Sequence, residues 1–189
     1  MQTSFYERDV LTVARELLGC VVRHGACAGV IVETEAYHES EPACHAFIGL
    51  TARTQTLFAA PGYAYVYLSY GIHVMLNAVA EVEGVGAAVL IRALQPVDGI
   101  ELMRARRGVQ DLEQLCSGPG KLTQALGIGL EHNATSLATG PIVIEAAERG
   151  LAPAELEASV RIGITKAAEL EWRFSIRDSR FVSRPWPRI

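Results

Sequence analysis

A run of 27 residues without Asp, Glu, Lys or Arg, residues 54–80, constrains the fold of this chain more than any other feature of its sequence. A run of this length could form a membrane-spanning helix. Pro61-Gly62 interrupts it, however, and Tyr63, Tyr65 and Tyr67 alternate with the period of two that is typical of a strand. The run therefore predicts strands and no membrane segment.

The same run predicts a β-hairpin, in which strands 63–69 and 72–80 meet at a Tyr70-Gly71 tip. Gly71 can supply the positive φ that a short turn needs. An aromatic tip on an uncharged ribbon suits a wedge that enters stacked bases or a partner's groove. The alternative is a buried tip, because tyrosine often packs with only its hydroxyl in water.

The whole chain of 189 residues, half of them apolar and a fifth charged, can bury roughly 70% of its unfolded surface as one domain. Apolar spacing and turn residues predict three helices: one over 5–18, one that Asp98 caps and that ends at Arg107, and one over 119–126. Strands are predicted over 20–24, 28–37, 63–69, 72–80, 87–94, 141–146, 160–165 and 173–177. Residues 38–56 are predicted to form a loop. The expected fold is α+β, a single domain over residues 1–189 with a curved, mostly antiparallel sheet, surrounding helices and a protruding β-hairpin.

Charge and cysteine usage bear on location and partners. The formal charge of −4 excludes a polycationic packing protein, yet residues 161–189 hold seven basic side chains against three acidic ones. That segment is either a surface that faces an anion or a solvated face. No export signal is indicated, so we expect a cytoplasmic protein. The four cysteines, at no C-x-x-C spacing, are expected to be buried thiols.

Two carboxylates share one face of the predicted strand 28–37. Glu33, Glu35 and Tyr37 alternate, so their side chains lie about 7 Å apart on that face. If the face is buried, mutual repulsion and a low dielectric favour general acid or base chemistry. The alternative is an exposed face with two solvated acids. Apolar Val30-Ile31-Val32 favours the interior strand.

Other chemistries fit the sequence less well. Zinc-ligand residue types gather between residues 33 and 45, namely Glu33, Glu35, His38, Glu39, Glu41, Cys44 and His45. Their spacing matches no zinc-hydrolase motif, so we expect neither metal nor cofactor. Gly118-Pro119-Gly120-Lys121 is not a phosphate loop, because Leu122 stands where Ser or Thr is needed. No G-x-S-x-G nucleophile motif occurs.

Several segments, taken in order, are similar to one enzyme family. They are Val32–Tyr37, Cys44-His45, Pro61-Gly62, Tyr65–Tyr67 with Tyr70-Gly71 and Asn77, Arg92–Pro96, Cys116–Pro119 with Lys121-Leu122, Arg161–Ile164 and Trp172–Phe174. Together they resemble the alkyladenine (3-methyladenine) DNA glycosylases over residues 5–178. The chain departs from the family pattern at Thr54, where the family often has asparagine, and at His73, where it has tyrosine. The spacing from Tyr37 to His45 is also shorter by one than in the vertebrate form.

The resemblance implies a monofunctional enzyme that flips an alkylated or deaminated purine out of duplex DNA and hydrolyses its N-glycosidic bond. Glu35 matches the general base, which would deprotonate a water held also by Arg92 and by the backbone carbonyl of Ile162. The spacing of the two carboxylates, apart from the resemblance, predicts that Glu33 tunes Glu35. The chain's two lysines, Lys121 and Lys166, make Schiff-base chemistry less suited than hydrolysis.

The resemblance also implies a base pocket. Tyr37, His45 and Tyr67 match the residues that sandwich the extruded base, where a cationic purine gains roughly 0.5–2 kcal/mol from cation–π contact. Asn77 matches the residue that crowds the 2-amino group of guanine and so rejects the normal base.

For the duplex itself, Tyr70 matches the intercalating residue, with Ile72 and His73 beside it on the hairpin. Arg53 and Lys121 are candidates for phosphate contacts. We expect a monomer whose partner is duplex DNA with a damaged purine, with 3-methyladenine, 1,N6-ethenoadenine and hypoxanthine as lesions. The alternatives are a catalytically degenerate lesion- or nucleic-acid-binding module, and a metal hydrolase built on the His/Glu/Cys cluster.

Overall fold

The computed structural model describes residues 1–147 and 149–184 and is built on an antiparallel sheet. Its strands are β1 (Val21–His24), β2 (Cys27–His38), β3 (Ala64–Ser69), β4 (His73–Val79), β5 (Ala87–Asp98), β6 (Ile142–Glu145), β7 (Leu156–Ser159) and β8 (Arg173–Ile176). They follow the order β3-β4-β5-β2-β1-β6, and β8 pairs with both β2 and β7. The predicted α+β class with a mostly antiparallel sheet is confirmed.

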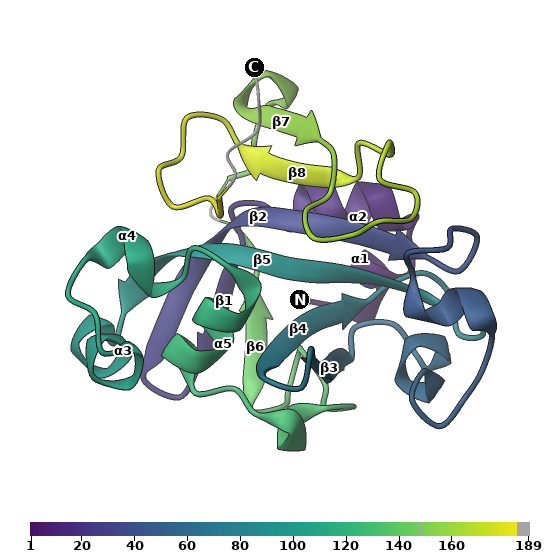
Figure 1. The fold of residues 1–189 in the computed structure, drawn as a ribbon, viewed down its shortest axis with the longest axis horizontal. Coiled ribbons are helices and arrows are strands. Elements are labelled where there is room, and N and C mark those ends of the chain that lie inside the picture. Colours follow the sequence, from purple (N-terminus) through teal and green to yellow (C-terminus); the bar gives the residue numbers. More distant parts are fainter. Residues whose placement is uncertain (148, 185–189) are drawn as a thin grey trace.

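The sheet forks along β2. One edge of β2 pairs with β5, whereas its other edge pairs first with β1 and then, over Glu33–Glu35, with β8. Figure 1 shows β2 and β5 as the central strands, with β8 and β7 on one side and the β3–β4 hairpin on the other. Glu33, Thr34 and Glu35 are therefore flanked by β5 on one edge of β2 and by β8 on the other.

Short helices flank this sheet. They are α1 (Thr3–Tyr6), α2 (Val10–Glu16), α3 (Ile100–Arg107), α4 (Leu112–Leu115) and α5 (Pro119–Leu126), with single 3-10 turns η1 (His45–Ile48), η2 (Gln55–Phe58), η3 (Leu130–His132) and η4 (Pro153–Glu155). Figure 1 shows α3, α4 and α5 gathered at one end of the sheet. Val13, Ala14, Met103 and Leu122 from these helices are fully buried in the main hydrophobic core. No helix in the described part of the chain is long and apolar enough to cross a membrane.

Three sequence predictions about these elements are wrong. The helix predicted over 5–18 is split into α1 and α2, because the Asp9 carboxylate accepts from the Thr12 N–H and starts a new helix there. Asp98 caps no helix: it ends β5 and pairs with Arg23 at 2.9 Å, and α3 begins after Gly99. The strand predicted over 160–165 is a loop, and β7 lies just before it.

The predicted hairpin is confirmed, and its tip is exposed rather than buried. β3 and β4 pair from Ala64↔Ala78 to Ser69↔His73. Gly71 has a φ of 73°, and Tyr70 has a φ of 49°, which is unusual for a residue with a Cβ. The side chain of Tyr70 is 85% exposed and stabilises no core. Such strain without packing gain points to a functional tip.

Candidate active site

A cavity of about 470 Å³ opens between β2, the hairpin and the loop after β7. Its volume is within the usual range for small-ligand sites. Among its lining residues are most of the predicted site residues: Glu35, Tyr37, His45, Arg53, Tyr67, Tyr70, His73, Asn77, Arg92 and Ile162. Ile72 lies instead on the exposed hairpin tip, and Lys121 lines a second, neighbouring cavity.

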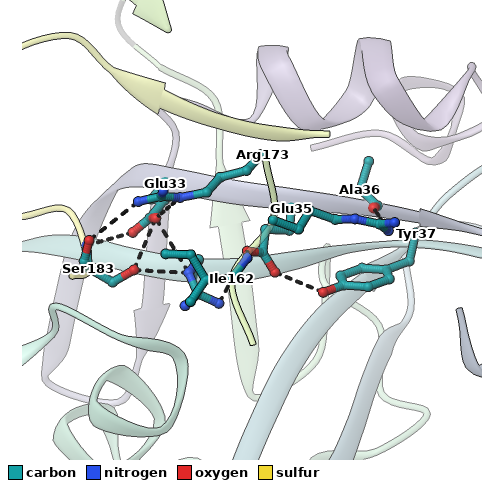
Figure 2. A network of polar contacts seen from close by, with 9 residues as sticks. Glu33, Glu35, Ala36, Tyr37, Ile162, Arg173 and Ser183 are labelled. Carbon is teal, nitrogen blue, oxygen red and sulfur yellow. Dashed lines mark hydrogen bonds and ion pairs between the residues drawn. The ribbon is translucent and has the colours of Figure 1, made fainter. Parts of the chain in front are cut away.

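Glu35 is fully buried at the inner wall of this cavity. Its Oε1 accepts from the Ile162 N–H at 2.8 Å and lies 3.3 Å from the Arg92 guanidinium, and its Oε2 accepts from the Tyr37 hydroxyl at 2.8 Å. Figure 2 shows Tyr37 and Ile162 meeting this carboxylate. Charge-assisted hydrogen bonds of this kind stabilise an ionised carboxylate that has left bulk water. The predicted interior position of Glu35 is confirmed.

Ile162 contacts Glu35 through its N–H, not through the carbonyl that the family resemblance implies as a water ligand. The loop that carries Ile162 is held by the neighbouring Arg161, whose guanidinium donates to the Ala36 carbonyl at 2.9 Å. The water-holding role of the Ile162 carbonyl stays a prediction.

Arg92 reaches Glu35 because β5 departs from regular pairing at this point. The register steps from Glu33↔Ala93 to Thr34↔Ile91, so Arg92 is an extra, unpaired residue in the ladder. A bulge of this kind redirects a side chain. Arg92 lies between the carboxylates of Glu33 and Glu35, which offsets the repulsion that the sequence predicts for this pair.

Tyr37 stays a hydrogen-bond donor toward Glu35. Burial raises the pKa of its phenol far above the ordinary value, and the nearby Glu35 charge raises it further. The Arg161 guanidinium carbon lies 4.6 Å from the centre of the Tyr37 ring, yet Arg161 is not among the residues that line the cavity. One face of the Tyr37 ring therefore lies against the Arg161 guanidinium, and the other face is free to line the cavity.

Aromatic rings form the opposite wall. His45 meets Tyr67 edge-on at 4.7 Å between ring centres, and Tyr65 stacks on Tyr67 at 5.2 Å. Burial raises the pKa of Tyr67 to about 12, whereas burial and then the Arg53 charge lower the pKa of His45 below its ordinary value. At neutral pH the wall is thus uncharged apart from Arg53, which lies 3.5 Å from His45 Nε2.

Asn77 and His73 complete the rim. The Asn77 amide nitrogen donates to the Tyr65 carbonyl at 3.0 Å, which fixes the side chain at the cavity. The His73 ring packs on Gly120 at the start of α5, where a Cβ would meet it at 3.0 Å. The hairpin therefore rests on α5, a contact that the sequence analysis missed.

The sequence analysis also missed a buried network around Glu33. Its carboxylate accepts from the Arg173 guanidinium and from the N–H of Ser183 at 2.7 Å. Ser183 carries no motif that could have singled it out. Glu33 is not among the residues that line the cavity, so it does not meet a ligand directly.

The cluster of possible metal ligands is divided among other partners. Glu41 pairs with Arg161 at 2.7 Å, and Glu39 accepts from the Gly86 N–H at 2.8 Å. Among residues 1–147 and 149–184 no group of three or more His, Cys, Asp or Glu could hold a metal ion. The four cysteines are free and buried, as predicted.

Comparison with known proteins identifies the family. The family model described as methylpurine-DNA glycosylase matches residues 4–180. The chain belongs to this family. It is therefore a DNA glycosylase, an enzyme that hydrolyses N-glycosidic bonds in DNA.

Proteins provisionally named 3-methyladenine DNA glycosylase are similar to this glycosylase over nearly its whole length. The protein from Bradyrhizobium diazoefficiens is 50% identical over 188 residues, which cover 100% of this chain and 92% of the relative. One from Rhodopseudomonas palustris (strain BisB18) is 52% identical, covering 98% and 92%. One from Methanoculleus marisnigri is 49% identical, covering 97% and 98%. The resemblance derived from the sequence motifs is confirmed.

Proposed function

We propose that this DNA glycosylase removes 3-methyladenine, 1,N6-ethenoadenine and hypoxanthine from duplex DNA, with Glu35 as its general base. The observation that carries the proposal is the Glu35 carboxylate, fully buried at a cavity that is walled by Tyr37, His45 and Tyr67. A purine turned out of the duplex presents its glycosidic carbon at such a wall.

In the proposed reaction Glu35 takes a proton from a water that attacks this carbon as the bond to the base breaks. Arg92 and the carbonyl of Ile162 hold the water. General-base catalysis contributes roughly 10²–10⁴-fold, and the fixed negative charge favours the oxocarbenium-like sugar of the transition state. Neither Lys121 nor Lys166 lines the cavity, which supports water rather than an amine as the nucleophile.

Base selection is assigned to the aromatic walls. Tyr37 on one side and His45 with Tyr67 on the other stack on the extruded base, and their uncharged rings attract a cationic alkylpurine. Asn77, fixed by its bond to the Tyr65 carbonyl, excludes guanine through its 2-amino group.

DNA capture is assigned to the hairpin and nearby cations. Tyr70 fills the gap left by the extruded nucleotide, flanked by Ile72 and His73. Arg53 at the cavity rim and Lys121 in the neighbouring cavity contact phosphates. We further propose that residues 1–189 act as one glycosylase domain, as a monomer in the cytoplasm, without metal or cofactor.

The test is release of free base from duplexes that each carry one of the three lesions. Wild-type protein is expected to release all three bases, and Glu35→Gln is expected to bind these duplexes with near-normal affinity yet release none. Glu83→Gln, an exposed carboxylate in the turn between β4 and β5, is the matched control and should be normal.

A near-normal rate for Glu35→Gln would remove Glu35 from the role of base. If wild-type protein binds a lesion duplex without releasing its base, the degenerate binding module is the better description for that lesion. Loss of activity with a chelator would favour the metal hydrolase instead.

A further inference from the structure

The buried carboxylate of Glu33 forms a network that ends at the catalytic cavity. Glu33 is fully buried and lies two residues from Glu35 on β2. Besides the Arg173 guanidinium, its Oε1 accepts from the Ser183 hydroxyl at 3.0 Å, and its Oε2 accepts from the Ser183 N–H at 2.7 Å. Figure 2 shows Arg173 and Ser183 reaching Glu33 from different sides.

The Ser183 hydroxyl has a second partner, Arg92. While it donates to Glu33, its oxygen accepts from Arg92 Nε at 2.9 Å, and Glu33 itself lies 3.4 Å from that nitrogen. The other end of the same guanidinium lies 3.3 Å from Glu35. Arg92 is thus held at Nε and meets Glu35 through a terminal nitrogen.

Arg92 has room to lie elsewhere. It lines both the main cavity and the neighbouring one of about 280 Å³, in which Ser183 is also a wall residue. An arginine side chain has several rotatable bonds, and its freedom favours disorder unless contacts fix it. The contacts at Nε are those that fix the guanidinium on the Glu35 side.

We propose that Ser183 is a positioning residue, whose hydroxyl, anchored on Glu33, holds Arg92 in the orientation that serves Glu35. This inference rests on the proposed function, because it takes Arg92 as a catalytic residue. A small displacement of such a group lowers the rate of the chemical step much more than it lowers DNA affinity.

The experiment compares Ser183→Ala in the wild-type and Arg92→Gln backgrounds, using single-turnover excision of hypoxanthine and the Kd of the lesion duplex. Ser183→Ala is expected to lower the excision rate constant about tenfold with Kd changed less than twofold. In the Arg92→Gln background, Ser183→Ala should lower the rate no further, because the guanidinium that the Ser183 hydroxyl positions is already absent. Ser183→Thr, which keeps the hydroxyl, should restore most of the rate.

The control is Ser159→Ala. Ser159 is the last residue of β7, and its hydroxyl is buried without a hydrogen-bond partner among the described residues. Equal losses from Ser183→Ala in both backgrounds, or no loss in the wild-type background, would overturn the inference. If Ser183→Ala does not fold, a rate for Ser183→Thr as low as that of Arg92→Gln would overturn it. Normal excision by Arg92→Gln would instead refute the role of Arg92, and no excision by the wild type would refute the proposed function.

A second, independent observation concerns the outer face of Tyr37. Arg161 stacks on that ring and lies 5.3 Å from the Trp172 ring, and its only carboxylate partner among the described residues is Glu41, at 2.7 Å. The side chains of Arg161 and Glu41 are 0% and 5% exposed. An uncompensated cation here would repel a cationic base stacked on the inner face of Tyr37.

We infer that Glu41, by neutralising Arg161, determines the preference of the cavity for cationic over neutral lesions. This inference also rests on the proposed function. Glu41→Gln leaves the Arg161 charge in place, so the ratio of 3-methyladenine to hypoxanthine excision should fall about tenfold. Because the ratio is taken on one preparation, it does not depend on the fraction of folded protein.

Glu39→Gln is the matched control, because Glu39 contacts the Gly86 N–H and not Arg161. Its ratio should equal that of the wild type. An unchanged or raised ratio for Glu41→Gln would overturn the inference, whereas failure of the wild type to remove either lesion would refute the proposed function itself.

Discussion

At the scale of single residues, the site combines buried charges with uncharged rings. The Glu35 carboxylate lies among three donors, the Ile162 N–H, the Tyr37 hydroxyl and the Arg92 guanidinium. Burial shifts the pKa of His45, Tyr67 and Tyr37 away from the charged form of each ring. A cationic purine would thus find one anion and no competing imidazolium. This balance depends on pH through His45.

We predict a pH-dependent lesion preference. The pKa of His45 is lowered from 6.5 by burial and by Arg53, so the ring is neutral above pH 6.5 and is protonated only as pH falls below that value. Its proton then destabilises the fold, since the unfolded chain binds it more readily. The ratio of 3-methyladenine to hypoxanthine excision should fall from pH 7.5 toward pH 5.

Single-turnover rates on both lesions across this pH range provide the measurement. Tyr65, Tyr67 and Arg53 are the titratable groups in contact with His45. Burial raises the pKa of both phenols, so neither ionises in this range, and arginine side chains stay protonated in proteins. His45→Phe should remove the pH dependence of the ratio. The same fall in His45→Phe would assign it to another group.

At the scale of elements, the hairpin holds a strained tip in solvent. Tyr70 is 85% exposed at a φ of 49°, a conformation that costs a residue with a Cβ about 1 kcal/mol. Asparagine adopts this region more readily than tyrosine. A substitution of Tyr70 can therefore raise the stability of the fold while it weakens the binding of DNA.

We therefore predict that Tyr70→Asn raises the free energy of unfolding by up to about 1 kcal/mol while it weakens binding of lesion duplex at least tenfold. The single-turnover rate at saturating protein should change less than the Kd does. Urea unfolding and DNA titration measure the two effects. Leu130→Asn, an exposed apolar residue of η3, should leave Kd unchanged. Unchanged affinity and rate in Tyr70→Asn would exclude the wedge.

Close packing at Gly86 joins β5 to the loop that carries His45. A Cβ at Gly86 would collide with Ala46 and lie 2.9 Å from the Phe58 ring, and the Gly86 carbonyl accepts from Cys44. A methyl group at Gly86 therefore fits only if Ala46 of η1 and the Phe58 ring of η2 both move.

Gly86→Ala is predicted to destabilise the fold by roughly 1–3 kcal/mol, as overpacking does, and to lower excision by displacing His45. Denaturant unfolding and single-turnover excision provide the readouts. Gly150→Ala, with nothing within 4 Å of the added atom, should be neutral in both. Wild-type stability in Gly86→Ala would show that η1 adapts without cost.

At the scale of the whole molecule, the net negative charge of the chain opposes DNA binding, and only local groups of cations favour it. The chain carries a formal charge of −4, so affinity must come from a few cations near the cavities, such as Arg53 and Lys121. Each phosphate contact releases counterions and makes binding weaker as salt rises.

The Kd of lesion duplex should therefore rise steeply between 50 and 200 mM salt, and Lys121→Gln should lower the slope of log K against log salt by about 1. Arg23→Gln is the control, because Arg23 lies on β1 and pairs with Asp98 and Glu145. Fluorescence anisotropy titrations at several salt concentrations measure the slope. An unchanged slope for Lys121→Gln would remove Lys121 from the DNA interface.

The sequence by itself determined the local features: the β-hairpin and its tip, the strand that carries Glu35, and α5 between Pro119 and Gly127. Alternating side chains and turn glycines specify these through neighbours in the chain. Only the tertiary structure decided how Arg92 leaves the ladder, how Ser183 reaches Glu33 across 150 residues and how Arg161 reaches Glu41 across 120. Those contacts arise because buried charges must find partners wherever the folded chain places them, and no local pattern records that choice.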